Sequence, residues 1–270
     1  MQRGRGVYQS LKCKVDHQSS LSMSFANKSI GEVGFAGVCV SNGGTAYVDR
    51  VCLTDVVAVV FCNWKRFLYE IRNCTISNMR QMGLKQEKEV LLKLLIIQFN
   101  KNQSHGVNIG PNGYGYISGN IIEENGAEGV WCGGNVDLLG NNDIVEGGAS
   151  RAVLIDNIIR QNGLSGISFD GGFFEVKGNL IHSNWLWGIM VKSRSYTYIQ
   201  NNEICENKCG GIRIGHNYTA AVFIDGNTIR DHTGPGIYTV NSIHNLFGKV
   251  KEENTNGKNI KRSQLQMETA

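Results

Sequence analysis

Four stretches of the chain read almost alike: DNIIRQNGLSGI (156–167), GNLIHSNWLWGI (178–189), NNEICENKCGGI (201–212) and GNTIRDHTGPGI (226–237). Each contains Asn, one residue, Ile, two residues, Asn or His, three residues and then Gly-Ile. The closing glycines are Gly166, Gly188, Gly211 and Gly236, so the repeat steps are 22, 23 and 25 residues. A near-constant step of this length, without a heptad or a long amphipathic block, is typical of a solenoid.

Within one repeat, apolar and polar residues alternate with the period of two that a β-strand requires. Ile204, Ile212 and Ile214 fall on one side, and Glu203 and Arg213 fall on the other. Asn and Gly lie between these short strands, and both tolerate left-handed backbone angles at sharp bends. The sequence therefore predicts an all-β fold, a right-handed parallel β-helix of about nine coils of 21–25 residues.

Coils stacked at the inter-strand distance of about 4.8 Å would align equivalent residues in columns. Stacked amides at this spacing can hydrogen-bond to one another and to the turn backbone, so an asparagine ladder is expected. Aliphatic columns are expected to fill the core. One amide column is Asn102, Asn125, Asn162, Asn184, Asn207 and His232, where His232 substitutes for Asn, and the other is Asn120, Asn157, Asn179, Asn202 and Asn227.

The recurring N-x-I-x-x-N-x-x-x-G-I pattern resembles the consensus of the parallel β-helix repeat proteins. That superfamily includes polysaccharide lyases, hydrolases and epimerases, and also non-enzymatic domains such as those of some animal F-box-type proteins. Regular coils with short loops, as in GNIIEENGAEGVW (119–131) and NNEICENKCGGIRI (201–214), look more like the F-box-type domains. The resemblance implies the fold and leaves the activity open.

The repeat also predicts the domain organisation. Residues 1–24 carry no repeat and are expected to form a cap or a frayed end, and 25–240 form the β-helix domain. The step from Gly129 to Gly166 is 37 residues, which predicts an excursion loop near 133–148 or a truncated extra coil. Residues 241–270 are expected to be a disordered polar tail, and 84–98 allow a coil, a short helix or a sequence artefact.

Composition narrows the function classes. The formal charge of +4 includes no run of Lys or Arg, so we expect no nucleic-acid partner, and no apolar window is long enough for a membrane span. Eight cysteines contain no CxxC pair, so no metal site and no cofactor are expected. Buried free thiols are the favoured interpretation, with disulfides as the alternative, which indicates an intracellular protein, cytoplasmic or nuclear.

One outward column carries candidate binding residues. It comprises Asn108, Trp131, Ser168, Met190, Arg213 and Tyr238, with Trp185 and Trp187 at its edge. Aromatic and Arg side chains dominate binding hot spots and can stack on sugar rings or anchor a peptide, whereas isolated exposed aromatics are ordinary surface. The candidate binding residues are Trp131, Trp187, Met190, Arg213 and Tyr238.

Candidates for catalysis are sparse. Glu206 and Asp231 occupy equivalent positions in adjacent coils, and two carboxylates about 5 Å apart suit a retaining hydrolase. The alternative is that Arg230 neutralises both at a solvated bend, and this is favoured, so no catalytic residue is assigned. Asp170 and Lys192 also fall in adjacent coils and are interpreted as a surface ion pair.

These observations predict a non-catalytic scaffold that binds a protein, or else a glycan, along its outward strand faces, and the balance is against an enzyme. The resemblance to the F-box-type domains implies a role in substrate recruitment during ubiquitination. The alternative is a carbohydrate-active lyase, hydrolase or epimerase.

Overall fold

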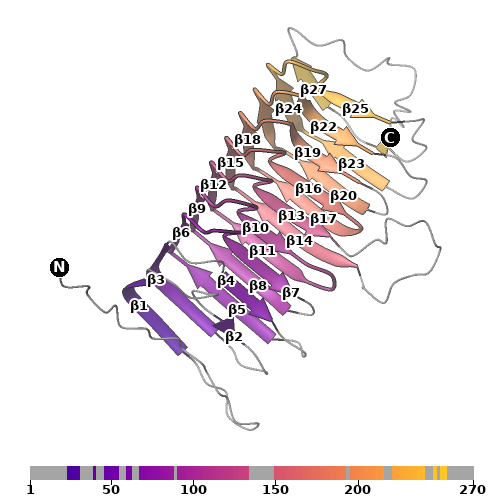
Figure 1. The fold of residues 1–270 in the computed structure, drawn as a ribbon. Coiled ribbons are helices and arrows are strands. Elements are labelled where there is room, and N and C mark those ends of the chain that lie inside the picture. The colour runs from indigo at the N-terminus through magenta and orange to yellow at the C-terminus, as the bar shows by residue number, and fades with distance from the viewer. Residues whose placement is uncertain are drawn as a thin grey trace, which may run out of the picture.

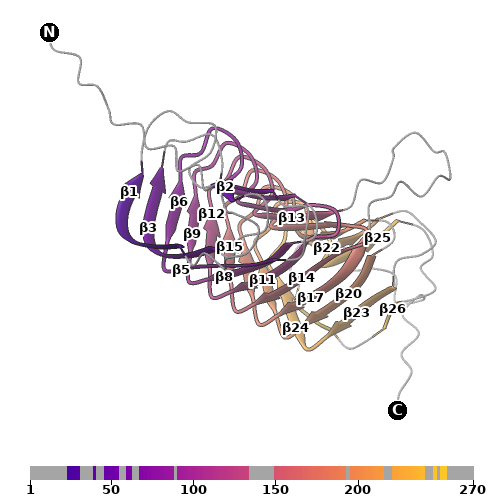
Figure 2. The ribbon, with the colours of Figure 1, turned by 90° about the horizontal axis from the view of Figure 1, so that it is seen from below.

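A computed structural model describes residues 23–30, 39–40, 46–54, 59–62, 67–87, 90–133, 149–192, 195–215, 221–240, 246–247 and 250–253. The secondary structure of these residues consists of 27 β-strands, which wind into one elongated stack of coils (Figure 1). Figure 2 shows the stack from below, with successive coils following one another from the N-terminal to the C-terminal end. The predicted all-β, right-handed parallel β-helix is confirmed.

Each complete coil contributes three strands, and equivalent strands lie side by side. The longer strands are β1 (Met23–Ile30), β3 (Ala46–Thr54), β5 (Phe67–Arg72), β8 (Val90–Leu95), β11 (Tyr114–Ser118), β14 (Ser150–Ile155), β17 (Gly172–Lys177), β20 (Ser195–Gln200), β23 (Ala221–Asp225) and β26 (Leu246–Phe247). Short strands follow after one sharp turn: β6 (Thr75–Ser77), β9 (Gln98–Asn100), β12 (Ile121–Glu123), β15 (Ile158–Arg160), β18 (Leu180–His182), β21 (Glu203–Cys205), β24 (Asn227–Arg230) and β27 (Val250–Glu253). Together they form an 18-stranded sheet.

The third strand of each coil belongs to a separate nine-stranded sheet. The strand pairings between coils of the described residues are parallel, and the register advances by one repeat, for example Ile167 with Ile189 and then Ile212. The nine strands of this sheet follow one another in chain order. They are β2 (Cys39–Val40), β4 (Val59–Cys62), β7 (Leu84–Glu87), β10 (Val107–Ile109), β13 (Val130–Gly133), β16 (Ile167–Asp170), β19 (Trp187–Val191), β22 (Gly210–Ile214) and β25 (Ile237–Thr239).

The first asparagine ladder runs through the turn between the short strands and the nine-stranded sheet. Asn162 donates from its backbone N and its Nδ2 to Asn184 Oδ1, at 3.1 and 3.0 Å. Asn184 repeats this pattern with Asn207 Oδ1, at 3.0 and 2.9 Å. At the end of the ladder His232 Nδ1 accepts the backbone N–H of Asn207 at 3.0 Å, so histidine takes the place of the amide acceptor as predicted.

A second ladder lines the turn between the long and short strands. Asn157, Asn179 and Asn202 each donate from backbone N and Nδ2 to the next amide oxygen, all at 2.9 Å. Each Nδ2 also donates to a backbone carbonyl of an earlier coil, such as Asn179 to Leu154 O at 2.9 Å. Polar groups that the turns would bury unpaired are therefore satisfied by the side chains of the repeat.

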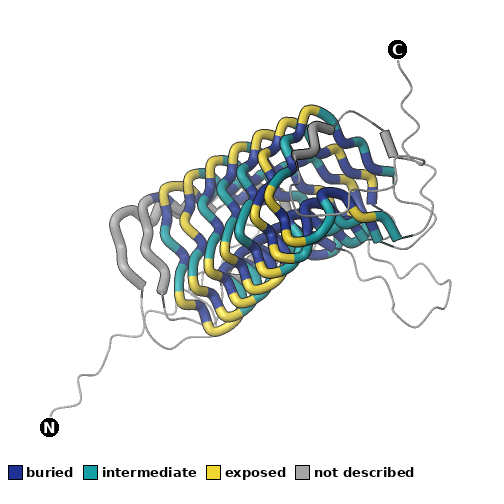
Figure 3. Tube along the Cα trace, turned by 90° about the horizontal axis from the view of Figure 1, so that it is seen from above, coloured by how far each residue is buried: buried dark blue, intermediate teal, exposed yellow. Residues whose placement is uncertain are grey.

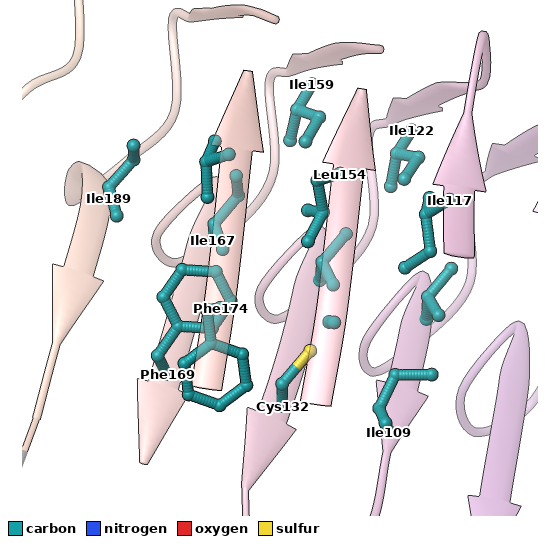
Figure 4. Close-up of a cluster of buried hydrophobic side chains, with 14 of the residues drawn as sticks. Ile109, Ile117, Ile122, Cys132, Leu154, Ile159, Ile167, Phe169, Phe174 and Ile189 are labelled. Carbon is teal, nitrogen blue, oxygen red and sulfur yellow. The ribbon is translucent and has the colours of Figure 1, made fainter. Parts of the chain in front are cut away.

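The core is a set of aliphatic columns inside the coils. Ile122, Ile159, Ile181, Ile204 and Ile229 are each 0% exposed. Figure 3 shows buried, intermediate and exposed residues as stripes that continue from coil to coil, which is the period-two alternation of each strand repeated along the axis. In Figure 4 buried side chains such as Ile122 and Ile159 point inward from neighbouring strands. Phe169 and Phe174 stack there with ring centroids 4.1 Å apart.

The repeat glycine is explained by close approach of the next coil. A Cβ on Gly166 would lie 2.8 Å from Gly188 O, Asn184 Nδ2 and Ile181 Cγ2. Real Cβ contacts are longer than this, so only glycine fits beside the ladder amide. The Gly-Ile element of the pattern therefore reflects the ladder and the core packing.

The stretch 84–98, whose conformation the sequence left open, continues the coil pattern. β7 pairs with β10 in the nine-stranded sheet, and β8 pairs with β5 and β11. β26 and β27 fall within 241–270, where a polar tail was expected, and β27 pairs with β24. Residues 1–22 and 134–148, which include most of the expected cap and excursion loop, lie outside the described residues.

Candidate functional site

The outer face of the nine-stranded sheet carries the predicted binding column. The register aligns Trp131 on β13 with Ser168 on β16, then Met190 on β19, Arg213 on β22 and Tyr238 on β25. Their neighbours along each strand point into the core, so these side chains point outward. We call this surface, from β10 to β25, the nine-stranded face.

On this face, two aromatic side chains from different coils stack on each other. Trp187 lies against Gly210, where a Cβ would be only 2.4 Å from the indole ring. This lets Trp187 stack on Tyr238, two coils further on, with centroids 5.8 Å apart and planes 25° apart. Trp187 and Tyr238 therefore form one surface, which the sequence predicted only as two separate residues.

Trp131 packs against His105, which contacts Glu128, and the sequence interpretation missed this pair. His105 stacks on its indole with centroids 6.1 Å apart, and His105 Nδ1 lies 3.0 Å from Glu128 Oε2. Burial tends to raise the pKa of Glu128, but the contact with His105 and the charges of His105 and Lys192 together hold the pKa below its ordinary value. The sequence contained a signal for this pair, because His105 and Glu128 occupy equivalent positions, each three residues before a residue of the outward column, Asn108 or Trp131.

Asp170 and Lys192 add charge at the other end of the same strands. Asp170 ends β16 and Lys192 follows β19, with the Lys192 backbone N–H donating to Phe169 O at 2.8 Å. Both are half-buried, whereas the sequence interpretation placed them at the exposed surface. Burial raises the pKa of Asp170, and the charge of Lys192 opposes this rise. Since Lys192 acts on both Glu128 and Asp170, its ammonium group influences both acids of the face.

Glu206 and Asp231 lie elsewhere, in the turn that carries the first ladder. Both have left-handed backbone angles, φ 56° and 58°, and both are exposed. Glu206 Oε2 accepts from Ser183 Oγ at 3.2 Å, and Asp231 Oδ2 accepts from Arg230 Nη1 at 2.6 Å. Arg230 therefore pairs with Asp231, as expected, but its second carboxylate partner is Glu203 and not Glu206.

The described residues contain neither a cluster of metal ligands nor a membrane-spanning helix. Across them, no three His, Cys, Asp or Glu side chains converge as a metal-binding group. The described part of the chain has no helix long and apolar enough to cross a bilayer. Four described cysteines, Cys74, Cys132, Cys205 and Cys209, are free thiols, and the first three are buried. Burial raises the pKa of Cys205 to about 11, which leaves its thiol protonated and unreactive at neutral pH.

Comparison with known proteins adds a family and a group of similar folds. A family model described as "Right handed beta helix region" matches residues 14–248. No curated protein sequence matches the chain. Among solved structures, the A-module of the Azotobacter vinelandii mannuronan C-5 epimerase AlgE4 is similar with a TM-score of 0.67 and 13% identity, covering 83% of this chain and 64% of that one.

Two further structures share the fold. The periplasmic alginate epimerase AlgG has a TM-score of 0.69 and 15% identity, covering 86% of this chain and 60% of its own. The pectate lyase Pel9A has a TM-score of 0.59 and 11% identity, covering 90% and 70%. The chain thus spans 60–64% of the length of these epimerase structures.

These findings correct the functional prediction. The similar solved structures are carbohydrate-modifying enzymes, which contradicts the main reading of a non-catalytic protein-binding scaffold and favours its alternative. The family model describes β-helix proteins in general and gives no support to an F-box-type domain or to ubiquitination. No comparison supports a protein partner, whereas a glycan is consistent with all three structures.

Proposed function

We propose that this chain, which belongs to the right-handed beta helix region family, binds an acidic polysaccharide on the nine-stranded face and modifies it chemically. The observation that carries the proposal is that half-buried Asp170 ends β16 and half-buried Lys192 follows the neighbouring β19, on the face that carries the aromatic rings. Burial tends to raise the pKa of both Asp170 and Glu128, and the charge of Lys192 acts to lower the pKa of both. Half-buried ionisable groups with shifted pKa values are typical of sites that bind charged ligands or transfer protons. The likeness to polysaccharide-modifying folds supports the same direction.

Binding would use both the rings and the cations of the face. Trp131 and the Trp187–Tyr238 pair offer aromatic surface that can pack against the apolar side of sugar rings. Their mutual contacts hold them in place, so little side-chain entropy would be lost when a ligand binds. Lys192 and Arg213 supply positive charge for the carboxylates of a polyuronate.

The chemistry would begin with removal of the proton next to the sugar carboxylate. This step is common to C-5 epimerisation and to elimination across the glycosidic bond, and it is easier when a cation neutralises the carboxylate. Lys192 is the candidate cation for that neutralisation. Asp170 is the candidate general base, because burial raises its pKa towards the range in which a carboxylate accepts protons effectively.

The test is incubation of the chain with mannuronan and with pectate, with and without Ca²⁺. Proton NMR would detect a changed sugar configuration, and ultraviolet absorbance would detect unsaturated chain ends. We expect activity on one of these polymers, with a loss of about 100-fold or more in Asp170→Asn. Lys192→Ala should lower kcat as well as raise KM, because it removes both the binding of the sugar carboxylate and its neutralisation during proton removal.

Glu206→Gln is the matched control, because it alters an exposed acid in the turn away from the nine-stranded face. It should keep full activity. Loss of activity in Glu206→Gln with normal activity in Asp170→Asn would move the site to the turn and reject this proposal. Absence of any change in either polymer would also reject it.

A further inference from the structure

The coil that contains β16 differs from its neighbours on the nine-stranded face, because its outward side chains are small. Ser165 and Ser168 stand where the preceding coil has Glu128 and Trp131 and the following coil has Trp187 and Met190. The two serines are each 0% exposed. Ser165 and Ser168 therefore form a strip of small side chains between the larger side chains of the two neighbouring coils.

The two hydroxyl groups of this strip differ in their partners. Ser165 Oγ accepts the backbone N–H of Trp187 at 3.4 Å. Ser168 Oγ is buried, and no group among the described residues forms a hydrogen bond with it. Ile167 and Phe169, its neighbours in β16, belong to the core, so strand alternation directs Ser168 outward onto the face.

An unpaired buried hydroxyl destabilises a folded chain, since it loses its hydrogen bonds to water and gains none. Alanine at this position would fill most of the same space without that cost. A site designed to hydrogen-bond a ligand hydroxyl keeps such a group, because the ligand supplies the missing partner and analogues that lack the hydroxyl are rejected.

Trp131 and Met190 flank Ser168 in the two adjacent strands. Trp131 is fixed by its stacking on His105, whereas Met190 on the other side is half-buried and unbranched. A thioether side chain with three rotatable bonds adapts easily to a ligand. Rotation of Met190 would therefore uncover Ser168 and leave Trp131 as the wall of a sugar subsite.

We propose that Ser168 is a specificity-determining residue whose Oγ hydrogen-bonds a ring hydroxyl of a sugar unit seated between Trp131 and Met190. This inference rests on the proposed function, because it assumes that the polysaccharide binds on the nine-stranded face. It adds a subsite in the middle of that face, one strand from both Trp131 and Met190.

The test is Ser168→Ala in the full chain, with binding of mannuronan and of pectate oligosaccharides measured by calorimetry and Tm measured without ligand. We expect about tenfold weaker binding, which corresponds to one lost hydrogen bond, together with an equal or higher Tm. Binding within twofold of the original chain would overturn the inference. A lower Tm would also overturn it, because it would show that the hydroxyl has a partner inside the folded chain.

Thr197 provides a matched control within the same protein. Its Oγ1 is likewise buried and without a hydrogen-bond partner among the described residues, but it points into the core from β20, between outward-facing Tyr196 and Tyr198. Thr197→Val should raise or preserve Tm and leave binding unchanged. Equal weakening of binding in both variants would indicate a global effect and reject the role of Ser168. Failure of the unaltered chain to bind either polymer would instead reject the proposed function.

Discussion

Replacing Asn184 with alanine should destabilise the protein far more than its single side chain suggests. Asn184 is 0% exposed, and its Oδ1 accepts the backbone N–H and the Nδ2 of Asn162 at 3.1 and 3.0 Å. Its Nδ2 donates to Asn207 Oδ1 at 2.9 Å and to Ile159 O at 3.2 Å. The substitution therefore removes four hydrogen bonds from the middle of the ladder.

The size of the stability loss depends on which hydrogen-bond partners of the Asn184 side chain keep another hydrogen bond. Asn162 Nδ2 still donates to Ile122 O at 3.1 Å, and Asn207 Oδ1 still accepts the backbone N–H of Asn184 at 3.0 Å. The Asn162 N–H and the Ile159 carbonyl lose the amide contact inside the stack. At about 1–3 kcal/mol for each buried group left unpaired, the expected loss is roughly 4 kcal/mol. Total stabilities of domains are about 5–15 kcal/mol, so this is a large fraction.

Urea denaturation followed by circular dichroism measures the loss, and amide hydrogen exchange locates it. Because each coil of a solenoid contacts only its neighbours, lost protection should be concentrated around Asn162 and Asn184. Thr233→Ala at an exposed turn position is the control and should change stability by less than about 0.5 kcal/mol. A loss below about 1 kcal/mol for Asn184→Ala would refute the ladder argument.

Three other predictions concern the ladder end, a strained turn and the repeat glycine. Burial lowers the pKa of His232 to about 4 from an ordinary 6.5, so the unfolded chain binds the proton more tightly and stability falls as the pH drops from about 6.5 to 4. Through His232, the free energy of unfolding should be about 2 kcal/mol lower at pH 5 than at pH 7. Urea titrations of His232→Asn should no longer show this difference. The same pH dependence in His232→Asn and in the original chain would contradict the prediction. Ile96 is 66% exposed with φ 55°, a strained angle for a β-branched residue, so Ile96→Gly should raise stability by about 1 kcal/mol. Gly119→Ala, at φ 66° in the equivalent turn of the next coil, should lower stability by a similar amount, and equal signs for the two variants would show that backbone strain is not the cause. Gly166→Ala should cost about 1–3 kcal/mol in thermal or urea unfolding, because its Cβ meets the next coil at 2.8 Å, and a neutral result would mean that the coils can move apart freely.

The sequence alone determined the architecture, because every coil of a solenoid repeats the same pattern of residues. Asn162, Asn184 and Asn207 recur at equivalent positions, and the structure hydrogen-bonds them in that order. Repeat spacing also predicted the outward column from Trp131 to Tyr238. Residues that are equivalent within the repeat become neighbours in space, so one-dimensional periodicity contains this part of the fold.

Only the tertiary structure decided which side chains meet across the columns. Trp187 reaches Tyr238 because Gly210 lies between them, and His105 contacts both Glu128 and Trp131 from a neighbouring coil. These contacts depend on side-chain direction and on the size of the intervening residue, and neither follows the repeat period. The pKa values of Asp170 and Glu128 also shift in opposite directions: burial tends to raise both, but the contact with His105 and the charges of His105 and Lys192 outweigh burial at Glu128 only. These influences depend on the groups packed around each carboxyl group and not on its place in the repeat.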